Sequence, residues 1–288
     1  MTQPQFLTAD EDGVLTPHPL GLVECSNDQY HSGPGISKSH LDKVAGKSLK
    51  HYWHAYINPE RERSEPTPAM AMGTAIHAAI LEPDTFASTI AVNPGIDRRS
   101  NAGKAEYAAF LAESKGKTII TDEQALACYS VRDAVHQHPL ASGLLTGGKA
   151  EQSFYGIDAE TGELIKCRTD YLPDNGSMIV DVKSTDDASP AGFGKSAANF
   201  RYPVQVAWYQ RVMDAAFGEH PPHWVFLAFE KEPPYAIGVY FADPSDTARA
   251  ALAAQRDFMR IVEAKRANAW PDYGTEALPL TLPTWWKP

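Results

Sequence analysis

Cysteine is scarce in this chain of 288 residues, and the three that occur, Cys25, Cys128 and Cys167, lie far apart. An odd number without paired spacing gives no disulfide framework and is typical of a reducing compartment. Three thiolates are also too few for an iron–sulfur cluster or for a zinc site made only of cysteine. The sequence therefore excludes disulfide-stapled scaffolds and metal sites built from cysteine alone.

Positive charge is in deficit, because 26 Lys and Arg face 36 Asp and Glu and give a net charge of −10. A protein that coats nucleic acid binds through an excess of positive charge, so this class is disfavoured. A nuclease is still compatible with the composition, because bound metal ions and a local basic groove can oppose a global negative charge.

Long apolar runs are also missing, since all fall far short of the ~18 residues that a membrane span needs. The opening residues MTQPQFLTADEDG have neither the basic start nor the apolar stretch of a signal peptide. Hydrophobic residues make up 43% of the chain, which excludes wholesale disorder. We therefore expect a soluble, cytoplasmic protein with no membrane partner.

The first half of the sequence is predicted to be mainly helical. Residues 1–35 lack periodicity and are expected to form an extended arm or a loosely packed start, and residues 58–68 are expected to be a charged linker broken by proline. Thr121 and Gln124 form a capping box that predicts the start of a helix ending at His138-Pro139. Apolar spacing predicts further helices at residues 36–56, 69–81 and 102–114.

The second half of the sequence alternates between strand and helix patterns. Strands are predicted at residues 151–158, 163–172, 177–183, 224–229 and 236–241. Residues 184–199 are expected to form a loop, followed by helices at 198–217 and from Asp243-Pro244 to about residue 269. We therefore expect an α/β fold with a mixed central sheet of about five strands flanked by helices.

These segments are expected to form one compact domain. Its parts are an arm and helix at 1–65, a helical segment at 66–145, a sheet with flanking helices at 146–270 and a tail at 271–288.

Two of the predicted strands carry residues suited to phosphodiester chemistry. Side chains alternate faces along a strand, so Asp181 and Lys183 share one face, and Lys166, Arg168 and Asp170 share a face of the neighbouring strand. Paired strands would bring two carboxylates and one ammonium together. Carboxylates hold Mg²⁺, which polarises a phosphoryl group, and the lysine can orient water or stabilise transition-state charge.

An ordinary structural interpretation competes with this one. A bare Asp-x-Lys sequence is most often a surface ion pair at a strand end. Asp181, however, lies within the apolar run Ile179-Val180-Asp181-Val182, where a buried carboxylate costs several kcal/mol unless a cation compensates it.

The order of Asp170 followed by Asp181-Val182-Lys183 resembles the core of PD-(D/E)XK nucleases, with Thr169 in place of the motif's proline. Residues 72–83 (MGTAIHAAILEP) are similar to the histidine helix of RecE-type phage exonucleases, the exodeoxyribonuclease VIII group. Residues 201–209 (RYPVQVAWY) are similar to their Gln-x-x-x-Tyr helix, and residues 36–39 and 47–52 resemble their N-terminal segment. The resemblance spans roughly residues 28–215.

The resemblance implies a metal centre and a set of catalytic side chains. The implied ligands of Mg²⁺, which Mn²⁺ can replace, are His77, Asp170, Asp181 and the backbone carbonyl of Val182. The implied catalytic residues are Asp170, Asp181, Lys183, Glu151, Gln205 and Tyr209. Gln205 and Tyr209 lie one helical turn apart and can reach the same phosphate, and with Lys195 and Arg201 they are the DNA-binding candidates.

Each of these residues also has a plainer interpretation. His77 could be a core or interface histidine, and Gln205 and Tyr209 could be helix-packing residues. Glu151, Lys195 and Arg201 could be solvated charges.

The activity implied by the resemblance is the Mg²⁺-dependent digestion of linear double-stranded DNA from its 5′ ends. The 3′ single strands produced would serve a RecT-like annealing protein in phage or prophage recombination inside a bacterial cell. Similar nucleases form closed rings, so a homo-oligomeric ring is expected. Two alternatives stay open, namely an endonuclease of restriction or repair type on the same core and a non-catalytic DNA-binding or assembly module with a decayed site.

Overall fold

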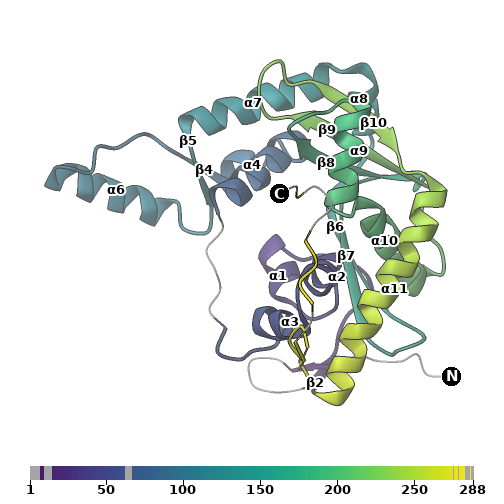
Figure 1. Ribbon diagram of the computed structural model, residues 1–288. Coiled ribbons are helices and arrows are strands. Elements are labelled where there is room, and N and C mark those ends of the chain that lie inside the picture. Colours follow the sequence, from purple (N-terminus) through teal and green to yellow (C-terminus); the bar gives the residue numbers. More distant parts are fainter. Residues whose placement is uncertain are drawn as a thin grey trace.

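A six-stranded mixed sheet forms the centre of the computed structural model (Figure 1). Its strand order is β10-β9-β8-β7-β6-β3, with β8 and β9 parallel and β7 antiparallel to both of its neighbours. The strands are β3 (Gly21–Val23), β6 (Gly148–Ile157), β7 (Leu164–Pro173), β8 (Met178–Thr185), β9 (His223–Glu230) and β10 (Ile237–Phe241). The expected α/β fold with a mixed central sheet is confirmed, and β3 makes the sheet one strand wider than expected.

The structure describes residues 7–9, 15–61, 67–274, 276–277, 279–282 and 286, with side chains from residue 18 onward. Residues 62–66 of the expected linker and Trp285 of the tail lie outside this part of the chain. Two small sheets pair β1 (Leu7–Ala9) with β2 (Leu15–Pro17) and β4 (Ile90–Asn93) with β5 (Thr118–Thr121). Among the described residues, no helix is long and apolar enough to span a bilayer.

Helices surround the sheet, and α6 stands away from the rest of the molecule (Figure 1). Before β6 they are α1 (Asn27–Ser32), α2 (Lys38–Gly46), α3 (Leu49–Tyr56), α4 (Pro68–Leu81), α5 (Phe86–Thr89), α6 (Asn101–Glu113), α7 (Asp122–Gln137) and α8 (Pro139–Leu144). After β8 they are α9 (Pro190–Asn199), α10 (Tyr202–Phe217) and α11 (Pro244–Ala267).

The two faces of the sheet bury different helices. On β8, Ile179 packs in a cluster that contains Trp208 of α10, whereas the next residue, Val180, packs in a second cluster that contains Ile76 of α4. This alternation is the period of two that a strand buried on both faces requires. It places α4, which carries His77, and α10, which carries Gln205 and Tyr209, on opposite sides of the same strands.

Local sequence signals set the ends of the main helices. The predicted capping box of Thr121 and Gln124 is present at the start of α7, and both of its hydrogen bonds form. α4 begins with proline at its first turn after a Thr67 cap. α10 ends at Gly218, whose φ of 80° is readily adopted only without a Cβ atom.

Three expectations about local structure were wrong, and one pair of strands had not been predicted at all. Residues 184–199 contain α9 rather than only a loop, because Ser189 caps a helix whose first residue is Pro190. The helix expected over 36–56 is broken into α2 and α3 at Lys47 and Ser48. Residues 1–35 contribute β3 and α1 to the body of the fold, and the parallel pair β4 and β5 was not anticipated.

Gly156 of β6 allows α10 to pack closely on the sheet. A Cβ atom at this position would lie 2.7 Å from the Cβ of Ala215 on α10 and 3.0 Å from nearby backbone atoms. Because α10 carries Gln205 and Tyr209, this close approach helps to set their depth over the sheet.

Lys166 of β7 is buried in an apolar environment, with 1% of its surface exposed. Its ammonium donates hydrogen bonds to the carbonyl oxygens of Tyr30 and, at 2.7 Å, of Gly33, and so holds the end of α1 against the sheet. Burial lowers the pKa of Lys166 from 10.5 to about 8.

The stability of the protein should therefore rise with pH, relative to Lys166→Met, between about pH 8 and pH 10.5. In this window the unfolded chain still protonates Lys166 while the folded chain does not, so the unfolded state binds more protons. A shift of this size corresponds to a change of about 3 kcal/mol in the free energy of unfolding. Urea unfolding of both proteins at several pH values measures it, and a constant difference across the window would contradict the prediction.

Candidate metal centre and active site

Three side chains with metal-binding atoms meet where α4 lies beside β6 and β7. His77, Glu151 and Asp170 each offer one such atom, and these atoms all lie within 4.8 Å of one another. Nδ1 of His77 is 3.9 Å from Oε1 of Glu151 and 4.0 Å from Oδ2 of Asp170. The side chains are 15% to 29% exposed and line a pocket, so they are shielded but accessible from solvent.

Glu151 reaches this group through an unusual backbone conformation. Its φ of 51° lies in the left-handed region, which costs a non-glycine residue about 1–3 kcal/mol. The pairs Ala150↔Tyr171 and Gln152↔Thr169 flank it, so Glu151 lies opposite Asp170 in the ladder.

The alternation of side chains along β6 changes phase at Glu151. Phe154 packs in the cluster that contains α10, whereas Ala150, an even number of residues away, packs against the cluster that contains α4. Strict alternation would place both residues on the same face. The distorted residue therefore coincides with the candidate site, as strained backbone often does.

Opposing effects set the charges of the three groups. Burial lowers the pKa of His77, but Asp170 and Glu151 outweigh it and raise the pKa above 6.5. Burial raises the pKa of Glu151, but contacts with His77 and Arg168 hold it below its ordinary value. Burial and then the nearby charge of Asp181 raise the pKa of Asp170 from 3.8 to about 6. Negative charge is thus crowded at Asp170, as expected of a site that attracts a cation.

Asp181 and Lys183 lie next to this group on β8. β7 and β8 are antiparallel and pair at Tyr171↔Val180. Asp170 and Asp181 are the adjacent residues on the two strands, so they lie opposite each other. The two strands are further linked by a hydrogen bond of 2.7 Å from the N–H of Val182 to Oδ2 of Asp170.

Asp181 is held by two partners and is only 1% exposed. Gln205 of α10 donates a hydrogen bond of 2.6 Å to its Oδ1. Nζ of Lys183 lies 2.5 Å from Oδ2, but not in hydrogen-bond geometry, so Oδ2 is a buried acceptor without a hydrogen bond. Burial lowers the pKa of Lys183, yet Asp181 and Asp170 more than offset this and keep it above its ordinary value.

A family model described as a PDDEXK-like domain of unknown function (DUF3799) matches residues 39–278. The chain belongs to this family. The matched segment contains the whole constellation described above, and the predicted membership in the PD-(D/E)XK group is confirmed. No curated protein sequence matches the chain.

One of the similar solved structures supports the PDDEXK-like fold. A protein from Eubacterium rectale named "Putative exonuclease" is 14% identical and has a TM-score of 0.62, with 90% of this chain and 97% of that chain covered. SSO0001 is 15% identical with a TM-score of 0.29, and covers 83% of this chain and 88% of its own. An alkaline exonuclease from Laribacter hongkongensis is 12% identical with a TM-score of 0.26, and covers 60% and 88% respectively. Only the first similarity is strong enough to support the fold.

The PDDEXK-like site brings together most of the residues predicted from the sequence, in a different grouping. Glu151 joins His77 and Asp170, whereas Asp181 is turned toward Lys183 and Gln205. Tyr209 lines the same pocket as His77, whereas Gln205 lines a different pocket, so their expected contact with one phosphate stays a prediction. The expected role of the Val182 carbonyl as a ligand stays a prediction.

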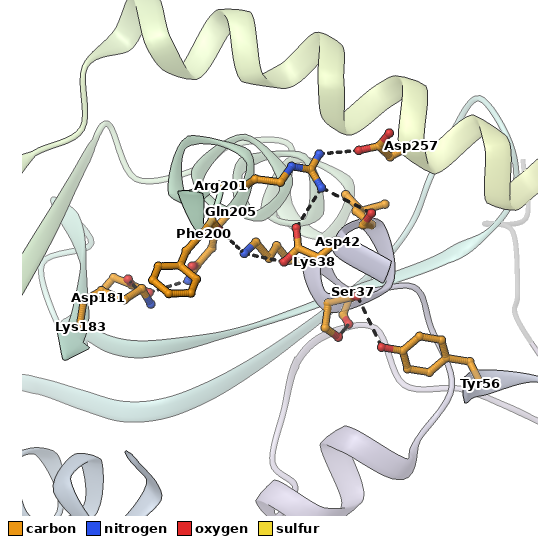
Figure 2. Close-up of polar contacts among 12 residues, drawn as sticks. Ser37, Lys38, Asp42, Tyr56, Asp181, Lys183, Phe200, Arg201, Gln205 and Asp257 are labelled. Atoms are coloured by element: carbon orange, nitrogen blue, oxygen red, sulfur yellow. Dashed lines mark hydrogen bonds and ion pairs between the residues drawn. The ribbon is translucent and has the colours of Figure 1, made fainter. Parts of the chain in front are cut away.

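The two basic DNA-binding candidates differ in their surroundings. Lys195 is exposed on α9 and does not line the pocket of His77 and Asp170. Arg201 caps α10 with a φ of 57° and forms ion pairs with Asp42, at 3.0 Å, and with buried Asp257. Its guanidinium therefore joins α2, α10 and α11 (Figure 2).

Arg168 is a site residue to which the sequence assigned no role. Its Nε donates a hydrogen bond of 2.7 Å to Oε2 of Glu151, and its Nη1 contacts Oγ of Ser153 at 2.6 Å and the carbonyl of Cys25 at 3.1 Å. It fixes one oxygen of Glu151 and leaves the other, Oε1, directed at His77. Arg168 lies two residues before Asp170 and on the same face of β7, and this spacing could have indicated from the sequence that Arg168 belongs to the site.

The donor set fits a divalent cation. Two carboxylates and one imidazole are grouped within 4.8 Å, and the orphaned Oδ2 of Asp181 is a further buried oxygen beside them. Carboxylate oxygens suit Mg²⁺ and Mn²⁺, whereas the cysteine ligands typical of structural zinc are missing from this group.

Proposed function

We propose that this protein is a metal-dependent exodeoxyribonuclease that degrades linear double-stranded DNA. The observation that carries the proposal is the group of His77, Glu151 and Asp170 beside the buried pair of Asp181 and Lys183. Carboxylates next to a protonated lysine suit phosphodiester hydrolysis, in which negative charge grows on the phosphoryl oxygens. The name of the Eubacterium rectale protein, with its TM-score of 0.62, supports an exonuclease over an endonuclease.

In this mechanism, His77, Glu151 and Asp170 would hold the cation, with Asp181 at the edge of the group. The bound cation supplies a Lewis acid that neutralises phosphoryl charge and makes water more acidic. Lys183 stays protonated, so its ammonium can orient the attacking water or stabilise negative charge on the phosphoryl oxygens.

Gln205 and Arg168 act on the reacting groups through their neighbours. Gln205 fixes Asp181, and Asp181 in turn fixes the ammonium of Lys183. Arg168 fixes Glu151 against His77. These contacts pre-organise the charged groups, so that little reorganisation is needed when charge develops.

The finer parts of the proposal rest on the resemblance to RecE-type exonucleases. They are the use of Mg²⁺ with Mn²⁺ as a substitute, digestion from 5′ ends, and release of 3′ single strands to a RecT-like annealing protein. A homo-oligomeric ring around DNA, a phage or prophage origin and a cytoplasmic location in the bacterial host belong to the same proposal.

Two DNA substrates of the same sequence test the activity. With Mg²⁺, the wild-type protein should digest a linear duplex and leave the covalently closed circle intact, while Asp181→Ala and Lys183→Ala should digest neither. Rapid linearisation of the circle would instead identify an endonuclease. Undiminished digestion by both variants would rule out the proposed site.

A further inference from the structure

A second pocket opens on the far side of Lys183, and it gathers positive side chains from several elements. It is lined by Lys38 of α2, Lys183 of β8 and Arg201 at the start of α10 (Figure 2), and by Arg256 of α11. The first pocket, with His77 and Asp170, does not include Lys183, so this residue connects the acidic group to a separate basic cavity.

Carboxylates balance these cations only in part. Asp42 lies 2.6 Å from Lys38 and 3.0 Å from Arg201, and Asp257 contacts both Arg201 and Arg256. With Asp181 beside Lys183, three carboxylates face four cations. Burial lowers the pKa of Lys38, the neighbouring Asp42 offsets part of this effect, and the smaller contributions of Lys183 and Arg201 lower the pKa again, as expected where cations repel one another. An anion in this pocket would relieve that repulsion.

Phe200 supplies an aromatic surface at the same pocket. Its ring is 61% exposed although it lies beside these charges, and its inner face stacks on Tyr202 with ring centroids 5.9 Å apart and planes at 19°. Tyr202 is buried and carries the Lys183 ammonium 5.1 Å from its own ring centroid. The carbonyl of Phe200 accepts a hydrogen bond of 2.8 Å from Lys38, so the aromatic ring and the Lys38 ammonium are held close together.

We propose that this pocket is a subsite for one unpaired nucleotide of the DNA strand being cut, with the base stacked on Phe200 and its phosphate held by Lys38 and Lys183. A phosphate-sized anion next to an aromatic face is the pattern by which proteins bind single strands without sequence preference. Lys183 and Gln205 belong both to this pocket and to the network of Asp181, so the nucleotide would lie next to the phosphodiester that reacts. The inference rests on the proposed function and adds where the strand is held.

Binding of a short fluorescent oligothymidylate, measured by anisotropy in EDTA so that no cleavage occurs, tests the stacking contact. Phe200→Leu should weaken binding roughly 5- to 100-fold, because the stacked ring is lost. Phe200→Trp should retain wild-type affinity, since it restores an aromatic face. Phe241→Leu is the matched control, because Phe241 is 70% exposed at the end of β10 and lines neither pocket.

The salt dependence of the same binding tests the phosphate contact. Lys38→Gln should weaken binding and flatten the slope of log affinity against log salt by about 0.7, the value for one phosphate of a single strand. Lys47→Gln, at an exposed lysine just after α2, should change neither. Thermal unfolding of each variant shows whether the fold is kept.

The outcomes separate this inference from the proposed function. Weaker binding by Phe200→Leu, with Phe200→Trp and Phe241→Leu unchanged, supports the subsite. Wild-type binding by Phe200→Leu, in a preparation of wild-type protein that digests linear DNA, overturns the subsite and leaves the nuclease assignment intact. A wild-type protein that neither binds the oligonucleotide nor digests DNA overturns both.

Discussion

Replacing Lys183 by glutamine should lower the rate of DNA cleavage by roughly 10²–10³-fold, the loss expected when one pre-organised charge donor is removed from a reacting phosphoryl group. Asp181 keeps its hydrogen bond from Gln205, so the buried carboxylate keeps a partner and the fold should survive. Single-turnover digestion of a linear duplex at saturating Mg²⁺ measures the chemical step.

The effect should fall on the rate and not on metal binding. Lys183 faces the second pocket, while His77, Glu151 and Asp170 line the first, so Mn²⁺ affinity by calorimetry should change little. Lys149→Gln is the control, because Lys149 is exposed on β6 of the same sheet and lines neither pocket. Cleavage by Lys183→Gln within a few-fold of wild type would remove the lysine from the mechanism.

Asp170→Asn should abolish detectable Mn²⁺ binding and reduce cleavage by at least about 10³-fold, because a charged ligand is replaced by a neutral one at the centre of the group. The amide oxygen can still accept the hydrogen bond from the Val182 N–H, so the contact between β7 and β8 is preserved. Asp174→Asn, in the exposed turn after β7, is the matched control and should behave as wild type.

The same substitution should stabilise the metal-free protein. The pKa of Asp170 is raised from 3.8 to about 6 in the fold, so the folded state binds more protons in this window and loses stability as pH rises through it. Above pH 6 and in EDTA, the free energy of unfolding of Asp170→Asn should exceed that of the wild type by up to about 3 kcal/mol. This difference should vanish below about pH 4. A variant that is less stable at pH 7.5 would show that Asp170 is structurally rather than functionally constrained.

The sequence predicted the parts of the site that depend on strand alternation and helical spacing. Asp181 and Lys183 are two residues apart on one strand, so a period of two already places them together. Gln205 and Tyr209 share a helix face, and the capped helix that carries His77 has the predicted extent to within one residue. These features are local and follow from backbone periodicity.

The parts that it did not predict depend on tertiary contacts and on strained backbone. The family resemblance named Glu151 as a catalytic residue, but no local pattern marks it for the left-handed region or as a direct neighbour of His77 in the metal-binding group. Arg168 receives its role from a neighbouring strand and from the residues before α1. The basic pocket at Phe200 joins segments more than 160 residues apart, so no window of sequence contains it.

The helix α9 was missed for a different reason. Glycines at 192 and 194 favour a loop, but the Ser189 cap with Pro190, and the burial of Phe193 in the main cluster, outweigh them. Packing thus overrides local propensity. Phe200 follows directly after this helix, so without α9 the sequence did not predict the aromatic ring at the second pocket.

Anomalous scattering from crystals soaked in Mn²⁺ would locate a bound metal ion without assuming its ligands. We expect a peak next to Nδ1 of His77, a carboxylate oxygen of Glu151 and a carboxylate oxygen of Asp170, and we expect no such peak in Asp170→Asn. A peak held by other residues in the wild-type protein, or none at these three, would contradict the proposed metal centre.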